Sequence, residues 1–311
     1  MGSRASYLHD VAGGDGEVVS RTLRCTMRVL VISAGLPSLG PAAAGSAVGA
    51  AWAELGHQVA VVAIGIGGRR LVDAVGSIPG TEVLLPVAGR SSEGLGRDLA
   101  ALDPDTRTVL VDLTGDCPDD AGAGLLEALG EPEVLTGRAL VGVAREEELD
   151  AALLGVRGVA ARRSFASGTP DIGAALAGDA VLAGLAARIG MPDPPPGAGA
   201  GNGLALAILA LGGVVRTGPQ IIGELVGVGR SLEAADLVVV VTEVLDFGGA
   251  GMAETRAASA WAEQGLVPCI AVAGQVTISS RELRTFGVES AYEVGDDPAA
   301  GAARVAHTWS W

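Results

Sequence analysis

The chain has 311 residues, of which 49% are hydrophobic and only 3% aromatic, and this length is enough for one large or two moderate domains with buried cores. Its formal net charge of −15 argues against nucleic acid and anionic membranes as partners, because both carry phosphate groups that basic residues must neutralise. All 21 basic residues are arginine, because the sequence contains no lysine. A phosphate site built on a lysine is therefore excluded.

The cysteines, the histidines and the apolar segments argue against further classes of protein. Three cysteines and three histidines are widely scattered and fit no metal-ligand spacing, so we expect no zinc site. The longest apolar runs contain glycine and are shorter than a membrane span requires. The N-terminus lacks the apolar segment of a secretory signal. These features predict a cytoplasmic protein.

The first part of the chain predicts an extension followed by a strand–helix–strand unit. Residues 1–26 are polar and glycine-rich, which predicts disorder, and translation from Met1 or from Met27 stays open. We expect strands at 28–32 and 58–63 from their β-branched runs, with a helix at 42–55 between them. A unit of this length predicts a parallel sheet.

The middle of the chain continues this alternation and ends in a glycine-rich stretch. We expect strands at 107–113 and 138–143, a helix at 170–190 and a proline-rich linker at 192–196. Alternating glycines then lead into the apolar run 204–211: Gly197, Gly199, Gly201 and Gly203. Glycine lets a backbone approach a ligand closely, and the N–H groups at a helix start can face a phosphate. The stretch predicts an anion-binding loop.

The C-terminal part predicts further α/β structure. A strand at 236–241 is followed by Asp246 and a glycine pair, and then by a helix at 251–264, a strand at 267–272 and helices at 281–286 and 299–306 around a short strand near Ala291. The pattern predicts parallel sheets, whose ligands usually bind at the carboxyl ends of the strands. We expect a cleft lined by the loops at 65–70, 114–121, 197–203 and 242–249.

Three segments resemble motifs of the bacterial type-1 glycerate kinases. PGAGAGNGL at 196–204 is similar to the family's PGAGAAGGL, TGDCPDDAGAGLLEALG at 114–130 to GGSATNDGGAGMLQALG, and ADLVVVVTEVLD at 235–246 to ADLVITGEGRLDG. The order matches the family over about residues 27–295, although a stretch of the family is missing between Pro86 and Ser91. The chain is identified as a shortened member of this family.

Several charged motif residues of the family are lost here. The loop SAGLPSLGPA keeps Ser38 but lacks the family's Asp and Lys. The loop GIGGRRL keeps Gly67 and Gly68, while Ile66 and Arg69 replace two acids. Phosphoryl transfer depends on positioning and on cations that offset developing negative charge. The resemblance therefore implies a degenerate active site.

The resemblance implies roles for particular residues. Asp120 corresponds to the family's motif acid, which is expected to take the proton of the substrate hydroxyl; the alternative is a helix N-terminal acid stabilised by the helix dipole. Two other candidate residues also have a purely structural alternative. Arg163 can be a solvated surface charge instead of a substrate contact, and Asp246 can be a turn residue instead of a metal ligand. The other candidate contacts are Gly67, Gly68, Gly197, Gly199, Gly201 and Gly203 for the nucleotide phosphates, Ser38, Arg69 and Arg163 for the substrate, and Asp246 for Mg²⁺. Asp116, which replaces a neutral motif residue, is a further candidate for Mg²⁺ together with Asp119 and Asp120; the alternative is an acidic first helical turn exposed to water.

The implied fold is a two-domain glycerate-kinase-like α/β fold with parallel Rossmann- or flavodoxin-like sheets. Its first domain would be discontinuous, at 27–65 and 275–311, and its second would be inserted at 66–274. The implied activity is phosphorylation of glycerate to phosphoglycerate with ATP and Mg²⁺. An inactive homologue that binds a small ligand or a protein stays open, as does homo-oligomerisation. A dinucleotide-binding protein is disfavoured, because no strand is followed by GxGxxG with an acid about 20 residues later.

Overall fold

The strands form two parallel sheets in a computed structural model that describes residues 26–80, 82–130, 132–246, 248–295 and 297–311. The first sheet has the order β2–β1–β7–β8–β9 and the second the order β3–β4–β5–β6. The strands of the first sheet are β1 Arg28–Ser33, β2 Gln58–Ala63, β7 Leu237–Leu245, β8 Cys269–Val276 and β9 Ser290–Glu293. Those of the second are β3 Glu82–Pro86, β4 Thr108–Asp112, β5 Ala139–Val143 and β6 Val214–Arg216. The predicted extension lies outside the described residues, except for residue 26.

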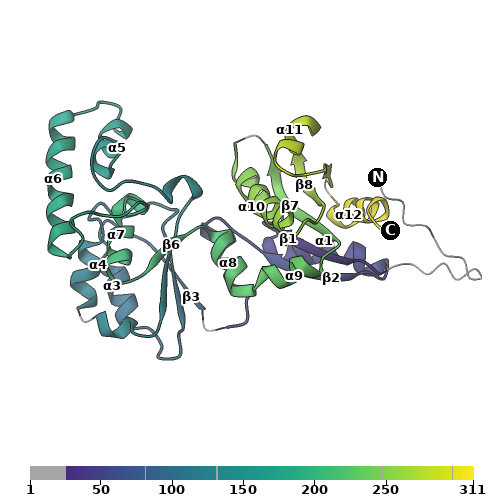
Figure 1. Cartoon of the computed structure of the whole chain (residues 1–311), viewed down its shortest axis with the longest axis horizontal. Coiled ribbons are helices and arrows are strands. Elements are labelled where there is room, and N and C mark those ends of the chain that lie inside the picture. Colours follow the sequence, from purple (N-terminus) through teal and green to yellow (C-terminus); the bar gives the residue numbers. More distant parts are fainter. Residues whose placement is uncertain (1–25, 81, 131, 247, 296) are drawn as a thin grey trace, which may run out of the picture.

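The helices divide between the two sheets, which lie in opposite halves of the molecule (Figure 1). The half with the first sheet contains α1 Pro41–Glu54, α2 Gly68–Gly76, α8 Gly218–Val226, α9 Val228–Ala234, α10 Ala250–Gln264, α11 Ser280–Thr285 and α12 Pro298–Thr308. The half with the second sheet contains α3 Glu93–Ala100, α4 Ala123–Leu129, α5 Val159–Ala166, α6 Ile172–Arg188, α7 Ala205–Ala210 and the short 3₁₀ helices η1 Pro132–Leu135, η2 Glu146–Glu148 and η3 Gly201–Gly203.

The first sheet confirms the predicted flavodoxin-like topology. Counted within that sheet, its strand order is 2-1-3-4-5, which places β1 beside β7 at the point where the strand order reverses. Residues 29–33 pair in parallel with residues 237–241. Both segments are buried β-branched runs, which suits a strand covered on its two faces. The loops after β1 and β7 therefore leave the sheet side by side.

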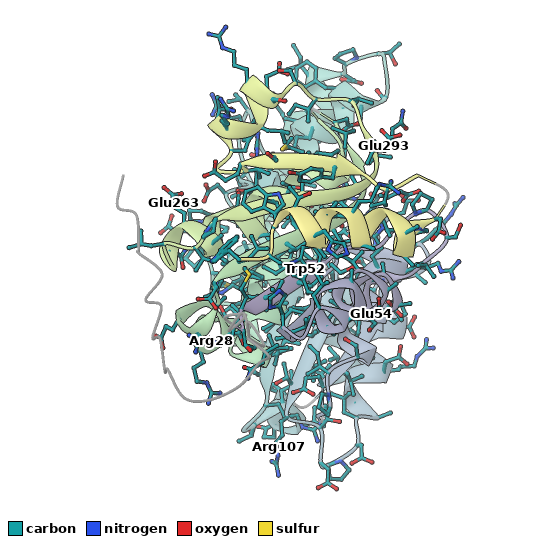
Figure 2. All side chains as sticks on the ribbon, turned by 90° about the vertical axis from the view of Figure 1, so that its right-hand side faces the viewer. Arg28, Trp52, Glu54, Arg107, Glu263 and Glu293 are labelled. Carbon is teal, nitrogen blue, oxygen red and sulfur yellow. The ribbon has the colours of Figure 1, made fainter. Side chains whose placement is uncertain are left out.

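Helices α1 and α12 cover one face of this sheet. Trp52 of α1 is fully buried in a core cluster that also contains Val31, Val239 and Val305. Figure 2 shows Trp52 inside the molecule, whereas Glu54 two residues later lies toward solvent. Helix α1 carries small residues on the face that approaches the strands, since a Cβ on Gly45 would meet the side chains of Val61 and Ser33. The close helix–sheet packing follows from this composition.

One hydrophobic core joins the two halves. It contains Leu30 and Val240 of the first sheet, Leu110 and Val143 of the second, and side chains of α2 and α8 such as Ile222. Helix α2 follows the strand at which the chain leaves the first sheet, and α8 follows the strand from which it returns. These two helices therefore carry both crossings between the halves.

The sheet pairing corrects the predicted domain boundary. We expected the inserted domain to extend to residue 274, but β7 pairs with β1 and β8 pairs with β7. The inserted part runs from about β3 to β6, and residues 237–276 belong to the first sheet. The cause is long-range pairing, which leaves no mark in the local sequence pattern.

Most predicted helices and strands lie within two residues of the observed ones, but β7 and β8 each extend four residues beyond their predicted ends at 241 and 272. Within the motif at 114–130, helix α4 starts only at Ala123, because the left-handed residues Ala121 and Gly122 break the backbone before it. The glycine run ends in a single 3₁₀ turn and a six-residue helix, α7. Among the described helices, none combines the length and hydropathy that crossing a membrane requires.

Candidate active site

A cleft of about 910 Å³ opens between the two sheets. Five parallel strands point their carboxyl ends at it, since it is lined by the loops after β2, β4, β5, β6 and β7 and by the first turn of α8. This is the usual ligand position in open α/β sheets. These segments contribute Ile66, Gly67, Gly68, Thr114, Gly115, Arg145, Glu146, Glu147, Thr217, Pro219, Gln220, Gly248 and Gly249.

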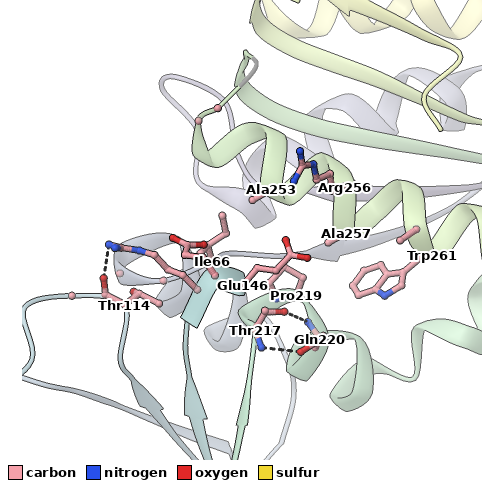
Figure 3. Close-up of a pocket in the computed structure, with 18 of the residues that line it drawn as sticks. Ile66, Thr114, Glu146, Thr217, Pro219, Gln220, Ala253, Arg256, Ala257 and Trp261 are labelled. Atoms are coloured by element: carbon pink, nitrogen blue, oxygen red, sulfur yellow. Dashed lines mark hydrogen bonds between the residues drawn. The ribbon is translucent and has the colours of Figure 1, made fainter. Parts of the chain in front are cut away.

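Helix α10 forms one wall of the cleft along its whole length. The residues that it presents recur every three or four positions, which is one helix face: Ala253, Arg256, Ala257, Ala260, Trp261 and Gln264. The alanines leave room along this wall. Figure 3 shows Thr114 at one end of the cleft and Trp261 at the other. From Gly249 to Trp261 the helix rises about 18 Å at 1.5 Å per residue.

The N-terminus of α10 opens at the same cleft. Its N-cap residue is Gly249, which has no side chain to accept a hydrogen bond from the first N–H groups of the helix. Free N–H groups and the helix dipole favour an anion at such an end. The N–H of Gly249 itself is paired, because Oδ1 of Asp246 accepts it at 2.6 Å.

Asp112 at the end of β4 connects the cleft loops of the two halves. Its Oδ2 accepts the N–H of Gly68 at 2.7 Å, and its Oδ1 accepts the N–H and hydroxyl of Thr114 at 3.0 and 2.6 Å. Gly67 is extended and packs directly on the Thr114 side chain. The predicted phosphate contacts Gly67 and Gly68 do line the cleft, but the N–H of Gly68 is already paired.

A smaller cavity of about 270 Å³, the side pocket, adjoins the cleft and shares Thr114, Gly115 and Arg145 with it. Burial raises the pKa of Glu148, and a hydrogen bond from Gly201 and the guanidinium groups of Arg145 and Arg162 oppose that shift. Burial also raises the pKa of the Cys117 thiol to about 12, so this thiol stays protonated at neutral pH. The remaining lining residues are Leu113, Asp116, Gly201 and Asn202.

The predicted base Asp120 lies outside the lining of both cavities. Its Oδ2 accepts hydrogen bonds from Ser91 Oγ at 3.2 Å, from the Ser92 N–H at 2.8 Å and from Ser92 Oγ at 3.0 Å, and its Oδ1 accepts the Gly122 N–H at 3.1 Å. Burial alone would raise the pKa of Asp120, but these bonds outweigh it and lower the pKa. The carboxylate joins the start of α3 to the loop before α4.

The glycine run packs against other backbone segments rather than against the cleft. A Cβ on Gly197 would lie 2.6 Å from the carbonyl oxygen of Leu149, and one on Gly199 would overlap that of Ala152. Gly201 and Gly203 have positive φ and approach Leu113 and Ala121. Of the predicted glycines 197–203, only Gly201 lines a cavity, the side pocket. Close backbone packing accounts for these glycines.

The remaining predicted residues are dispersed. Ser38 and Arg69 are exposed and line neither cavity, whereas Asp116 is exposed in the side pocket. Arg163 binds the end of the glycine run, since its Nε donates to Asn202 Oδ1 at 2.6 Å and its Nη2 to the Asn202 carbonyl at 2.9 Å. Asp246 caps the turn before α10. In the described part of the chain, no three His, Cys, Asp or Glu side chains are grouped to hold a metal ion.

Arg145, Arg256 and Trp261 are the prominent cleft residues that sequence reasoning did not single out. Arg145 stands two residues after β5, and its Nη2 donates to the Thr114 carbonyl at 2.6 Å, the bond drawn at Thr114 in Figure 3. Arg256 lies over the Phe286 ring at 4.9 Å. The position of Arg145 at a strand's carboxyl end and the helical spacing of Arg256 with small residues were signals available in the sequence.

An ion-pair cluster stands beside the cleft wall. Arg70 of α2 contacts Glu243 of β7 and places its Nη1 3.4 Å from both carboxylate oxygens of Glu254 on α10. The Thr242 hydroxyl donates to Glu254 Oε2 at 3.4 Å. The Glu254 side chain is 1% exposed. Burial raises the pKa of this carboxyl to about 7, although Arg70 and Thr242 favour its charged form.

Comparison with known proteins agrees with this architecture. Residues 173–310 match the model of the glycerate kinase family. The crystal structure of "putative glycerate kinase 2" from Salmonella typhimurium LT2 has a TM-score of 0.73 and 17% identity, covering 91% of this chain and 98% of that one. A glucose-galactose binding protein from Geobacillus stearothermophilus reaches a TM-score of only 0.17, with 11% identity and coverages of 91% and 89%. No curated protein matches the chain.

The family match covers the C-terminal part of the chain, which includes the glycine run, β7 and the α10 wall of the cleft. The structural likeness covers 91% of the chain and shows that the two proteins share a fold. Taken together, the family match over residues 173–310 and the shared two-sheet fold support membership of the glycerate kinase family.

Proposed function

We propose that this protein is an ATP-dependent kinase that phosphorylates a hydroxyl group of glycerate. The observation that carries the proposal is the cleft between the sheets, where the carboxyl ends of five strands and the N-terminus of α10 converge. Its volume of about 910 Å³ is in the range of cofactor-sized sites. Membership of a kinase family supports ATP as the donor, and the cytoplasm is the proposed location of the reaction.

The cleft supports one orientation of the nucleotide. The anion-favouring end of α10 and Arg145 lie at the end marked by Thr114, whereas the aromatic ring of Trp261 lies at the other end (Figure 3). The rise of about 18 Å along α10 suits an extended nucleotide. The triphosphate would then lie at Gly248 and Gly249, and the adenine would stack on Trp261.

The acidic residues at the cleft fit the metal that accompanies ATP. Mg²⁺ in kinases is bound mainly by phosphate oxygens and water, with one or two protein carboxylates. Glu146 and Glu147 line the cleft next to Arg145 and would supply such a ligand. Asp246 and Asp116, the metal ligands expected from the sequence, lie on a neighbouring loop and in the side pocket. The metal would offset phosphate charge and align the terminal phosphoryl group.

Calorimetric titration of the purified protein with Mg·ATP, with and without D-glycerate, tests the proposal. We expect saturable binding of Mg·ATP and glycerate-dependent release of ADP with formation of phosphoglycerate. Glycerol, which has the hydroxyl groups but no carboxylate, is the matched control acceptor. Binding of Mg·ATP without any turnover on D-glycerate would favour a family member that has kept the fold and lost the reaction. Absence of binding at millimolar Mg·ATP would contradict the nucleotide site itself.

A further inference from the structure

The cleft and the side pocket meet at Arg145. Only the cleft, at about 910 Å³, is large enough for a nucleotide, whereas the side pocket, at about 270 Å³, suits a small acid. Thr114, Gly115 and Arg145 line both cavities. A group that passes from a ligand in one cavity to a ligand in the other must therefore cross the boundary that these three residues form.

Arg145 differs from Arg70, which stands beside the cleft wall, in what its guanidinium group contacts. Across the described ranges of the chain, no carboxylate oxygen lies within 4.0 Å of its nitrogens. Its Nη2 donates a hydrogen bond to a neutral carbonyl oxygen, that of Thr114. Arg70, by contrast, is paired with Glu243 and Glu254. The charge of Arg145 is held in place and is not neutralised by a salt bridge.

Arg162, the other cation of the side pocket, is occupied by the protein itself. Its Nη1 donates to the carbonyl oxygens of Ala152 and Arg157 at 3.2 and 3.0 Å, and its Nη2 donates to that of Gly199 at 2.8 Å. These bonds tie Arg162 to the backbone around the glycine run. Arg145 is thus the cation better placed to meet a ligand.

We propose that Arg145 is a catalytic residue that binds the phosphoryl group in transfer, and that the side pocket holds the acceptor acid. This inference rests on the proposed kinase function. The acceptor hydroxyl oxygen forms a bond to the γ-phosphorus, the bond from that phosphorus to the β–γ bridging oxygen breaks, and ADP leaves with that electron pair. The hydroxyl proton goes to a side-pocket carboxylate, Asp116 or Glu148. The guanidinium offsets negative charge on the equatorial oxygens.

Arginine suits this role in a chain that has no lysine. Its planar group presents several N–H donors in a fork that matches phosphate oxygens, and it stays charged at every relevant pH. One Nη2 bond to Thr114 fixes the group and leaves other donors directed elsewhere. In the family's motifs this positive charge comes from loop lysines. Here Arg145, which follows β5, would supply it instead.

Arg145→Ala and Arg145→Lys test the inference, with Arg97→Ala as the matched control. Arg97 is an exposed arginine on α3 in the same half of the molecule, and it pairs with Glu93 four residues earlier. We expect Arg145→Ala to lower kcat about 10²–10³-fold, the usual cost of removing one donor to a transition-state oxyanion. The KM for D-glycerate and the Kd for Mg·ATP should stay near wild-type values. Arg145→Lys should have an intermediate kcat, and Arg97→Ala should match the wild type.

Two results would overturn the inference while the kinase function stands. One is a wild-type kcat in a folded Arg145→Ala variant, with folding checked by circular dichroism and thermal unfolding. The other is a rise in the KM for D-glycerate alone, which would make Arg145 a ligand of the acceptor carboxylate. A wild-type protein that binds Mg·ATP but does not phosphorylate D-glycerate would instead contradict the proposed function, and the inference with it.

Discussion

Nη1 of Arg70 lies 3.4 Å from the buried carboxylate of Glu254 and so connects α2, which begins at the cleft loop, to α10, which forms the cleft wall. This ion pair therefore joins α2, where the chain passes from the first half to the second, to α10, which lines the ligand cleft. Glu243 on β7 contacts the same guanidinium. One cation thus serves two acids, and the buried acid is the one whose pKa is raised to about 7.

Glu254 makes the stability of the fold depend on pH. Its pKa is about 7 in the folded state, against the ordinary glutamate value of 4.5, so the native protein binds more protons between these two pH values. The stability that this group contributes is fully present below about pH 4.5 and is lost as the pH rises through about 7. The loss amounts to at most about 3 kcal/mol at 1.36 kcal/mol per pKa unit.

Glu254→Gln should flatten this dependence, since the amide does not titrate. Urea unfolding at pH 5 and pH 8 measures the free energy of unfolding of the variant and the wild type. Glu243→Gln is the control, because that side chain is 42% exposed and contacts the same arginine. An unchanged pH slope in Glu254→Gln would show that another group titrates in this range.

Asp120 should matter for stability. Asp120→Ala removes the acceptor of four hydrogen bonds from Ser91, Ser92 and Gly122, and we expect a loss of roughly 1–3 kcal/mol in the free energy of unfolding. The lowered pKa means that this contribution is present above about pH 4 and is lost as the pH falls. Urea unfolding at pH 7 checks the magnitude. Abolished turnover in a fully stable Asp120→Asn variant would instead support the role of base that the motif implies.

Gly218 should resist substitution because of a close backbone contact between the two crossings. A Cβ at Gly218 would overlap the carbonyl oxygen of Gly65, whereas Gly115, also at the cleft, faces open space. We expect Gly218→Ala to lower the free energy of unfolding by about 1–3 kcal/mol and Gly115→Ala to change it by less than about 0.5 kcal/mol. Denaturant midpoints for the two variants decide this. Equal midpoints would mean that residues 65 and 218 can separate freely.

Trp261 should contribute to the binding of the adenine of the nucleotide. Removing an aromatic ring that stacks on a base costs about 1–3 kcal/mol, so Trp261→Ala should weaken Mg·ATP binding about fivefold or more and leave kcat at saturating ATP nearly unchanged. Trp311→Ala is the control, since that side chain is 59% exposed near the C-terminus. Calorimetric Kd values provide the comparison. Identical affinities for the wild type and Trp261→Ala would place the base elsewhere in the cleft.

Local features of the fold were predictable from the sequence because they depend on neighbouring residues. The β-branched runs at 28–33 and 237–245 form strands, and Gly56 ends α1 in a left-handed conformation. The motif pattern also led to the family. The candidate site was predictable only in part: Gly67 and Gly68 line the cleft, and Asp116 and Gly201 line the side pocket.

Tertiary structure decided the rest, because distant segments determine what each side chain meets. Val238–Val241 lie beside Leu30–Ser33 through pairing across about two hundred residues, and this moved the domain boundary. The carboxylate of Asp120 accepts hydrogen bonds from Ser91 and Ser92. These two serines lie outside the motif that contains Asp120, so the motif alone could not predict the contact. Arg145 belongs to no motif, yet β5 brings it to the junction of two cavities. The sequence by itself determined the α/β elements and the family, while packing between the two halves decided which residues face the cleft.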